Sequence, residues 1–259
     1  MIRVVKALWT TSLLTGMQYR SDFIFGLAMT VAWGAWSVIP LFLVFEHTSA
    51  IEGWTYPEAM LVMSFFLALR GLVDGFIEPN LHRLVLQIRE GTLDFVLLKP
   101  ADAQLLVSVQ RVVPGRLADL LGAIALGIWS LRAIDHQPTA GELFGALVCL
   151  ISGVLILYSL WLMAASTAFW WVRVDSLSHL LGAILDAGRW PISVYRGWLK
   201  AAFTFVLPVA LMTSYPAMAL RGALTVEQVA LAGGLGVGFA LLSRRLWRFA
   251  LSHYTSASS

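Results

Sequence analysis

Two pairs of oppositely charged residues lie in stretches that are otherwise apolar. Arg70 and Asp74 are four residues apart, and Asp186 and Arg189 are three apart. On a helix, both spacings place the two side chains of a pair on one face. An ionised side chain near the middle of a bilayer costs on the order of 3 kcal/mol. Each pair is therefore expected either to neutralise itself or to contact another subunit or a neighbouring cytoplasmic helix.

The sequence lacks the patterns that most often carry catalysis. It has no G-x-x-x-x-G-K-[ST] loop to cradle ATP phosphates, no H-E-x-x-H and no G-x-S-x-G. None of its histidines stands at metal-ligand spacing from another histidine or from the single cysteine, Cys149. No catalytic, metal or cofactor-binding residue is expected in this chain. An integral membrane enzyme acting on lipid should show clustered carboxylates or histidines, whereas the acidic residues here are scattered.

The segment from Ile88 to Pro100 mixes charged residues with large apolar ones. Gly91 and Pro100 mark its two ends. Within it, residues 93, 96 and 97 (Leu, Val and Leu) share one helical face. Apolar side chains exposed on a charged helix predict a docking surface for another protein. A helix lying on the membrane would show the same pattern.

The composition predicts that the elements holding these residues are membrane helices. The chain is 59% hydrophobic and only 13% charged, with a mean hydropathy of +0.78. Charge this sparse cannot cover a soluble domain of this length. We therefore expect one all-α transmembrane domain over residues 1–259, with about six spans. The expected spans are residues 23–45, 59–77, 112–131, 143–172, 176–195 and 226–247.

The remaining segments are expected to lie outside the spans. Residues 1–20 carry apolar side chains at helical spacing, which predicts an amphipathic helix on the membrane surface. Residues 78–102 are too charged for lipid and are expected to form a cytoplasmic region between the second and third spans. Residues 254–259 form a tail that is expected to be disordered.

Two threadings compete between residues 173 and 222. In the first, residues 176–195 form the fifth span, and residues 197–222 dip into the outer side of the membrane and return. In the second, residues 173–200 form a cytoplasmic loop and residues 201–220 form the span. Both threadings leave both termini on the same side. That side is rich in Lys and Arg in either case, which predicts that it is cytoplasmic.

Gly234 and Gly238 form a G-x-x-x-G motif in the last apolar stretch. Small residues at this spacing let two helices approach closely. The motif predicts packing within the chain, or alternatively a seam between two copies.

The order of these features resembles the permease subunits of type-2 ABC transporters, in particular a compact six-span bacterial family. In that superfamily, a Glu-x-Gly-Thr-Leu-Glu-like segment closed by a proline forms a coupling helix, which seats in a cleft of a separate ATPase. Here the acidic residue stands directly before the glycine, and an aspartate replaces the second glutamate. The corresponding residues are Arg89, Glu90, Gly91, Thr92, Leu93, Asp94, Lys99 and Pro100.

The resemblance also implies a proline-rich broken hairpin on the outer side before the last span, which favours the first threading. The residues that match it are Pro191, Trp198, Pro208 and Pro216. The superfamily further shares an interfacial helix before the first span.

The resemblance implies an assembly and a function. Two permease chains, identical or homologous, would form a pathway above two ATPase subunits, which would hold ATP and magnesium. The expected function is ATP-driven export across the bacterial cytoplasmic (inner) membrane, with no nucleic acid partner. A secondary transporter is a further alternative, but it should bury several ionisable residues in mid-span or show repeated halves.

Overall fold

The computed structural model describes residues 9–10, 20–171 and 175–254, and the regular secondary structure of this part is helical apart from one short β-hairpin. The prediction of an all-α membrane protein is confirmed. The elements are α2 (Arg20–Glu46), β1 (Ala50–Ile51), β2 (Trp54–Thr55), α3 (Tyr56–Leu72), α4 (Glu78–Arg89), α5 (Asp94–Leu97), α6 (Ala103–Ser108), α7 (Leu117–Ala133), α8 (Ala140–Ser166), α9 (Asp175–Asp186), α10 (Gly197–Ala201), α11 (Val209–Leu220) and α12 (Val226–Ser252).

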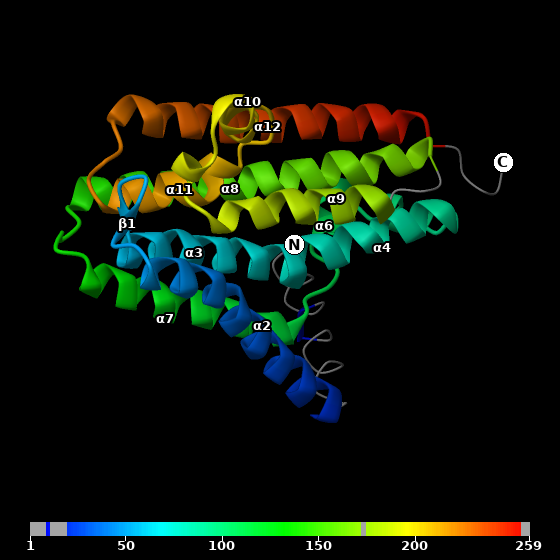
Figure 1. Ribbon diagram of the computed structural model, residues 1–259. Helices are drawn as coiled ribbons and strands as arrows, with labels where there is room; N and C mark the ends of the chain where they lie inside the picture. Colours follow the sequence, from blue (N-terminus) through cyan, green and yellow to red (C-terminus); the bar gives the residue numbers. More distant parts are fainter. Residues whose placement is uncertain (1–8, 11–19, 172–174, 255–259) are drawn as a thin grey trace.

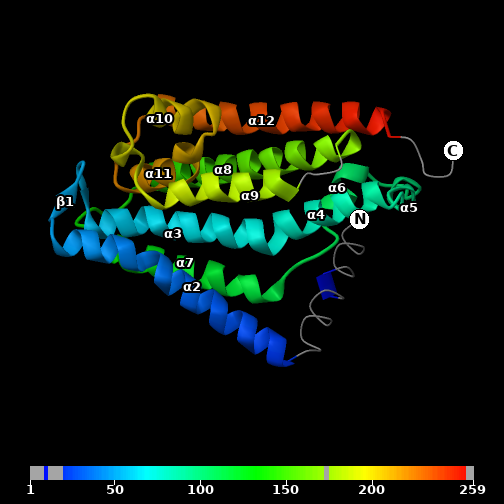
Figure 2. The same ribbon diagram turned by 45° about the vertical axis from the view of Figure 1, so that its right-hand side comes forward.

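The long helices lie roughly side by side along one axis (Figure 1). Helix α8 packs against α11 and α12, and α3 packs against α7 and α11. One apolar core runs through all of these helices, with Met63, Leu69, Ile156 and Leu162 fully buried in it. Helix α2 lies on the outside and diverges from α3 toward its own N-terminal end (Figure 2).

Four helices of the described part are long and apolar enough to cross a membrane. They are Ile24–Glu46, Tyr56–Arg89, Ala140–Phe169 and Val226–Ser252. The bent pair Gly197–Thr204 and Val209–Leu220 would make a fifth if it is one span. Helix α7 has 17 residues, which rise about 25 Å. The expected count of six spans stays a prediction.

The second long helix does not end at Ile77, where the sequence predicted the boundary of the span. It continues through a π-helical turn, Val73–Ile77, into α4 and ends only at Arg89. Pro79 explains the turn, because proline has no N–H and its ring clashes with the carbonyl four residues earlier. That carbonyl belongs to Gly75 and accepts instead from the backbone N–H of Val113 at 3.0 Å. The π turn therefore joins this helix to the segment before α7.

Helix packing uses small residues, but not the two that the G-x-x-x-G motif predicted. A Cβ atom on Gly236 would lie 2.9 Å from the Cα atom of Ser152, so α12 meets the backbone of α8 there. Gly234 and Gly238 are exposed and have open space around them. The prediction that these two glycines pack within the chain was wrong, because the face of α12 that carries Ala232, Gly236 and Ser243 is the buried one.

The chain between α9 and α12 folds back on itself. The pair formed by α10 with its π-helical extension and by α11 is bent by 84°, and Pro208 lies at the break. Arg196, just before α10, pairs with Glu52 of the β-hairpin at 2.5 Å. Arg221, just after α11, pairs with Glu58 at 3.3 Å. Both ends of the folded-back segment thus lie beside the β-hairpin between α2 and α3 and the first turn of α3.

The four residues that matched the expected broken hairpin before the last span differ in their exposure. Pro191, Pro208 and Pro216 are buried, whereas Trp198 is 80% exposed. Pro216 lies inside α11.

Of the expected N-terminal helix, residues 1–8 and 11–19 lie outside the described residues, and the ring of Trp9 lies 5.6 Å from that of Phe76 in the π turn. Of the expected tail, only Tyr254 is described.

Candidate functional site

The turn after α4 is set by Gly91. Gly91 adopts a left-handed φ of 67°, which glycine allows without a Cβ penalty. The N–H of Thr92 donates to the carbonyl of Gln87 at 2.9 Å, and that of Gly91 donates to the carbonyl of Ile88 at 3.3 Å. These two bonds form a Schellman motif, which ends the helix and reverses the chain. The short helix α5 therefore packs back against α4.

This reversal decides which face of α5 is exposed, and it overturns the predicted docking face. Leu93 is 0% exposed and Val96 is 4% exposed, and both belong to the apolar core, with Leu97 packed against it. The exposed apolar side chains are instead Phe95, at 70%, and Leu98, at 80%. The spacing of the apolar residues predicted a shared face correctly, but that face packs onto the chain itself.

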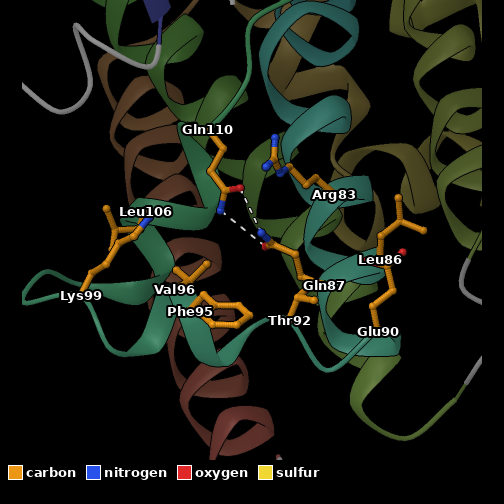
Figure 3. Close-up of a pocket in the computed structure, with 10 residues that line it drawn as sticks. All are labelled: Arg83, Leu86, Gln87, Glu90, Thr92, Phe95, Val96, Lys99, Leu106 and Gln110. Carbon is orange, nitrogen blue, oxygen red and sulfur yellow. Dashed lines mark hydrogen bonds between the residues drawn. The ribbon is translucent and has the colours of Figure 1, made fainter. Parts of the chain in front are cut away.

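A groove of about 510 Å³ lies between α4, α5 and the segment that follows α6. Figure 3 shows its lining, with Phe95 toward one end and Arg83 toward the other. The side-chain amides of Gln87 and Gln110 bond to each other across it at 3.2 Å. Its lining residues are Arg83, Leu86, Gln87, Glu90, Thr92, Phe95, Val96, Lys99, Leu106 and Gln110. The groove thus combines an exposed aromatic ring with charged residues on its rim.

The other predicted residues of this segment lie around the same turn. Arg89, Lys99 and Pro100 are exposed, and Asp94 is half-buried at the first turn of α5. Sequence reasoning missed Phe95 and Leu98. Their large apolar side chains in a charged segment were the available signal.

Asn80 joins the start of α4 to the segment between α6 and α7. Its side-chain amide donates to the carbonyls of Phe76 and Arg111, both at 2.6 Å, and its oxygen accepts from the N–H of Arg111 at 2.7 Å. Asn80 is 2% exposed. Buried amides of this kind stabilise only when their bonds are satisfied, so Asn80 holds α4 in register with the segment that leads to α7. Nothing in the sequence singled it out.

Helix α6 is tied to the last helix by an ion pair. Arg244 of α12 donates to both carboxylate oxygens of Asp102, and also to the side-chain oxygen of Gln104 at 2.7 Å. Asp102 itself caps α6 by accepting from the N–H of Leu105 at 3.1 Å. On the other side, Tyr158 of α8 bonds to Gln104 and Ser108. The segment after the groove is therefore fixed to both α8 and α12.

This ion pair predicts a dependence of stability on pH. The hydrogen bond from Arg244 holds the pKa of Asp102 below its ordinary value of 3.8. A carboxyl whose folded-state pKa is depressed stabilises the fold above the ordinary value and loses that contribution as the pH falls through the folded-state pKa. We expect Asp102→Asn to lower the unfolding temperature at neutral pH, and the difference from the wild type to shrink below about pH 4. Thermal unfolding of both proteins in detergent across this range measures it. A difference that does not change with pH would contradict the role of the pair.

The two charge pairs predicted from the sequence are brought together into one cluster. Arg70 bonds Asp74 at 3.2 Å and Asp186 at 3.4 Å, and Arg189 bonds Asp186 at 3.3 Å. The cluster also contains two residues from the start of α7 that had not been assigned to it. Arg116 lies 3.5 Å from Asp74 and 3.4 Å from Asp119.

The cluster joins α3, α7 and α9. Its three arginines and three aspartates balance in formal charge, which removes most of the cost of placing ions among apolar helices. Gly71 allows the close approach, because a Cβ there would lie 2.8 Å from the Cβ of Asp119. The i,i+3 spacing of Arg116 and Asp119 was the signal that could have added them.

A family model described as ABC-2 family transporter protein matches residues 31–258 of the chain. The chain belongs to the ABC-2 family. No curated protein and no solved structure matches it. The predicted resemblance to type-2 ABC transporter permeases is thereby confirmed over most of the sequence.

Membership in the ABC-2 family establishes the general class of function. The chain is a multi-pass membrane component of a transporter, and its family implies an ABC ATPase as partner. An ABC-2 membrane chain is a component of a transporter.

Proposed function

We propose that this chain is the permease subunit of an ATP-driven exporter and that a separate ATPase docks on the turn between α4 and α6. A second permease chain, identical or homologous, completes the pathway, and two ATPase subunits supply ATP and magnesium. The assembly lies in the bacterial cytoplasmic membrane with both termini of this chain in the cytoplasm. Helix α5 is the coupling helix of this proposal.

The observation that carries the proposal is the exposure of Phe95 and Leu98 beside the groove. The two side chains are 70% and 80% exposed. Transfer of such large apolar surfaces from water into a partner's pocket lowers the free energy. The rim adds Glu90 and Lys99, which give a partner charge to match. An aromatic anchor with a polar rim is typical of protein–protein interfaces.

The connection from this turn into the bundle supports a mechanical role. Helices α3 and α4 form one continuous helix through the π turn, so a displacement of α5 would reach the membrane helices directly. Asn80 and the bond from Val113 to Gly75 join this helix to the segment before α7. ATP-driven closure of the ATPases would then move packed helices as a rigid body.

Apolar faces that the bundle leaves uncovered support a second permease chain or lipid around it. Helix α2 exposes Phe25, Trp33, Trp36 and Phe42 by half or more. Helix α7 exposes Leu121 and Ile124 in the same way. Such faces bind either hydrocarbon tails or another apolar helix.

Co-purification with the partner ABC ATPase tests the docking role. We expect Phe95→Asp combined with Leu98→Asp to reduce ATPase recovery at least tenfold. Each apolar anchor of this kind contributes about 1–2 kcal/mol to the binding free energy. The chain itself should still be recovered from membranes, because both positions are exposed.

Val226→Asp is the matched control for this experiment. Val226 is 85% exposed and begins α12, whose starting end lies at the opposite end of the bundle from α5 (Figure 2). Equal ATPase recovery with the Phe95 and Leu98 variant and with the control would refute docking on α5.

A further inference from the structure

A second groove, of about 490 Å³, lies between α2 and the ion cluster. On one side it is lined by Gly26, Met29, Thr30 and Trp33 of α2. Its other side is lined by Arg70, Asp74, Val113, Gly115 and Arg116. These residues place the groove between the first half of α2, the π turn after α3 and the segment that leads into α7; the ribbon of α2 diverges from α3 in this part of the molecule (Figures 1 and 2). The groove therefore lies between helices, on the half of the bundle proposed to be cytoplasmic.

The charged wall of this groove presents cations. The side chains of Arg70 and Arg116 are 32% and 35% exposed, whereas that of Asp74 between them is 11% exposed. Asp119, the second partner of Arg116, is 10% exposed. Asp74 also lines the groove, but the two guanidinium groups are the more exposed charged groups of this wall.

The two guanidinium groups keep donors for a further anion. Each guanidinium has five N–H donors. The bonds found among the described residues join Arg70 to Asp74 and Asp186, and Arg116 to Asp74 and Asp119. Two arginines placed together with free donors match the geometry of a phosphate group, which accepts planar, paired hydrogen bonds.

The opposite wall of the groove is apolar and open. Met29 and Trp33 of α2 are 51% and 65% exposed. Neither Gly26 on this wall nor Gly115 on the charged wall has a heavy atom within 4 Å of the position that a Cβ would take. The groove therefore has room for a hydrocarbon chain beside the cationic wall.

We propose that this groove binds an amphiphile with an anionic phosphate headgroup, which reaches it sideways from the inner half of the bilayer. The phosphate bonds Arg70 and Arg116, and the acyl chain lies along Met29 and Trp33 of α2. The amphiphile is the class of solute that the transporter carries, and this role rests on the proposed export function. The binding itself requires only this chain.

Binding of dioleoyl phosphatidic acid to the purified full-length chain in detergent, followed by native mass spectrometry, tests the site. We expect Arg116→Gln to weaken binding about tenfold or more, the effect of losing charge-assisted hydrogen bonds. Arg189→Gln is the control, because Arg189 belongs to the same ion cluster but does not line the groove. It should leave binding within about threefold, since its bonds face Asp186. Equal weakening by the two substitutions would overturn the site.

A second variant tests the groove without touching the ion cluster. Gly26→Leu should fill the open space and abolish binding, whereas Gly234→Leu, at an exposed helical glycine of α12, should not. Both replacements favour a helix, so neither is expected to unfold the chain. Retained binding with Gly26→Leu would overturn the proposal even if Arg116→Gln failed to fold.

Two further probes identify the ligand class. Dioleoyl phosphatidylcholine, in which a choline offsets the phosphate charge, should bind much more weakly than phosphatidic acid. Glycerol 3-phosphate, which lacks acyl chains, should not displace phosphatidic acid at equal concentration. Equal binding of phosphatidylcholine would overturn the anionic headgroup, and displacement by glycerol 3-phosphate would overturn the acyl-chain site in favour of a soluble phosphate.

The failure of this proposal can be told apart from a failure of the export function. Lipid binding is measured without the ATPase, and ATPase recovery is measured without added lipid. If no phosphatidic acid binds while the ATPase still co-purifies, only the groove proposal fails. If phosphatidic acid binds in the groove but no ATPase associates, the site stands as a lipid site and its transport role fails.

Discussion

Replacing Leu93 with arginine is expected to destabilise the whole chain, although Leu93 lies in the segment proposed to bind the ATPase. Leu93 is 0% exposed and packs in the main apolar core. A charge placed there has no partner to offset its loss of hydration, and such substitutions cost roughly 4 kcal/mol or more. Size-exclusion chromatography and thermal unfolding in detergent should show aggregation or a large drop in the unfolding temperature.

Phe95→Arg is the matched control for Leu93→Arg. Phe95 lies two residues away and is 70% exposed. Its replacement should change the free energy of unfolding by only about 0.5 kcal/mol, while ATPase recovery falls. If Leu93→Arg folds normally and Phe95→Arg does not, the placement of α5 against α4 is wrong.

Gly236→Leu is expected to separate α12 from α8. The new side chain would begin 2.9 Å from both the Cα and the Cβ atoms of Ser152, so the two backbones would have to move apart. Overpacking of this kind costs about 1–3 kcal/mol or more when the obstacle is backbone. The contact between Ser243 and Ser159, 3.2 Å apart between the same two helices, would be strained as well. Thermal unfolding and protease sensitivity of the purified chain measure the loss.

Gly234→Leu is the control, on the same helix and of the same chemistry. Gly234 is exposed with open space around it, so the new side chain meets nothing within the chain. We expect unchanged or slightly higher stability, because leucine favours a helix over glycine by several tenths of a kcal/mol. Equal destabilisation by both substitutions would show that Gly234 also packs against a protein surface, as in a seam between two copies.

Much of the architecture could be predicted because it depends on local properties. The length of an apolar run decides whether a segment can cross a membrane, and the runs at 23–45, 143–172 and 226–247 have their counterparts in α2, α8 and α12. Helix boundaries were less predictable. The sequence places a polar stretch after Ile77, yet the helix continues to Arg89, because α4 buries Leu81, Leu84 and Val85 while its polar face stays outside.

The candidate docking site was likewise predicted in part correctly and in part wrongly from the sequence. Gly91 was expected to mark one end of the segment that closes at Pro100, and the structure has a left-handed turn there, a conformation that favours glycine after any helix. Which side of α5 then faces outward was predicted wrongly. The rotation of a four-residue helix about its axis is set by what the helix packs against. The apolar spacing of Leu93, Val96 and Leu97 would be the same whether their shared face packs against the rest of the chain or is exposed.

The sequence by itself determined the class of protein, the family and the charged residues that needed partners, since apolar run length, motif order and charge spacing are readable along the chain. Only the tertiary structure joined Arg70 to Asp186, 116 residues away, and brought Arg116 and Asp119 to the same cluster. It alone separated Gly236, which contacts α8, from Gly234, which does not. Such contacts depend on how each helix is rotated about its axis, and that rotation follows from the summed packing of all helices rather than from any one segment.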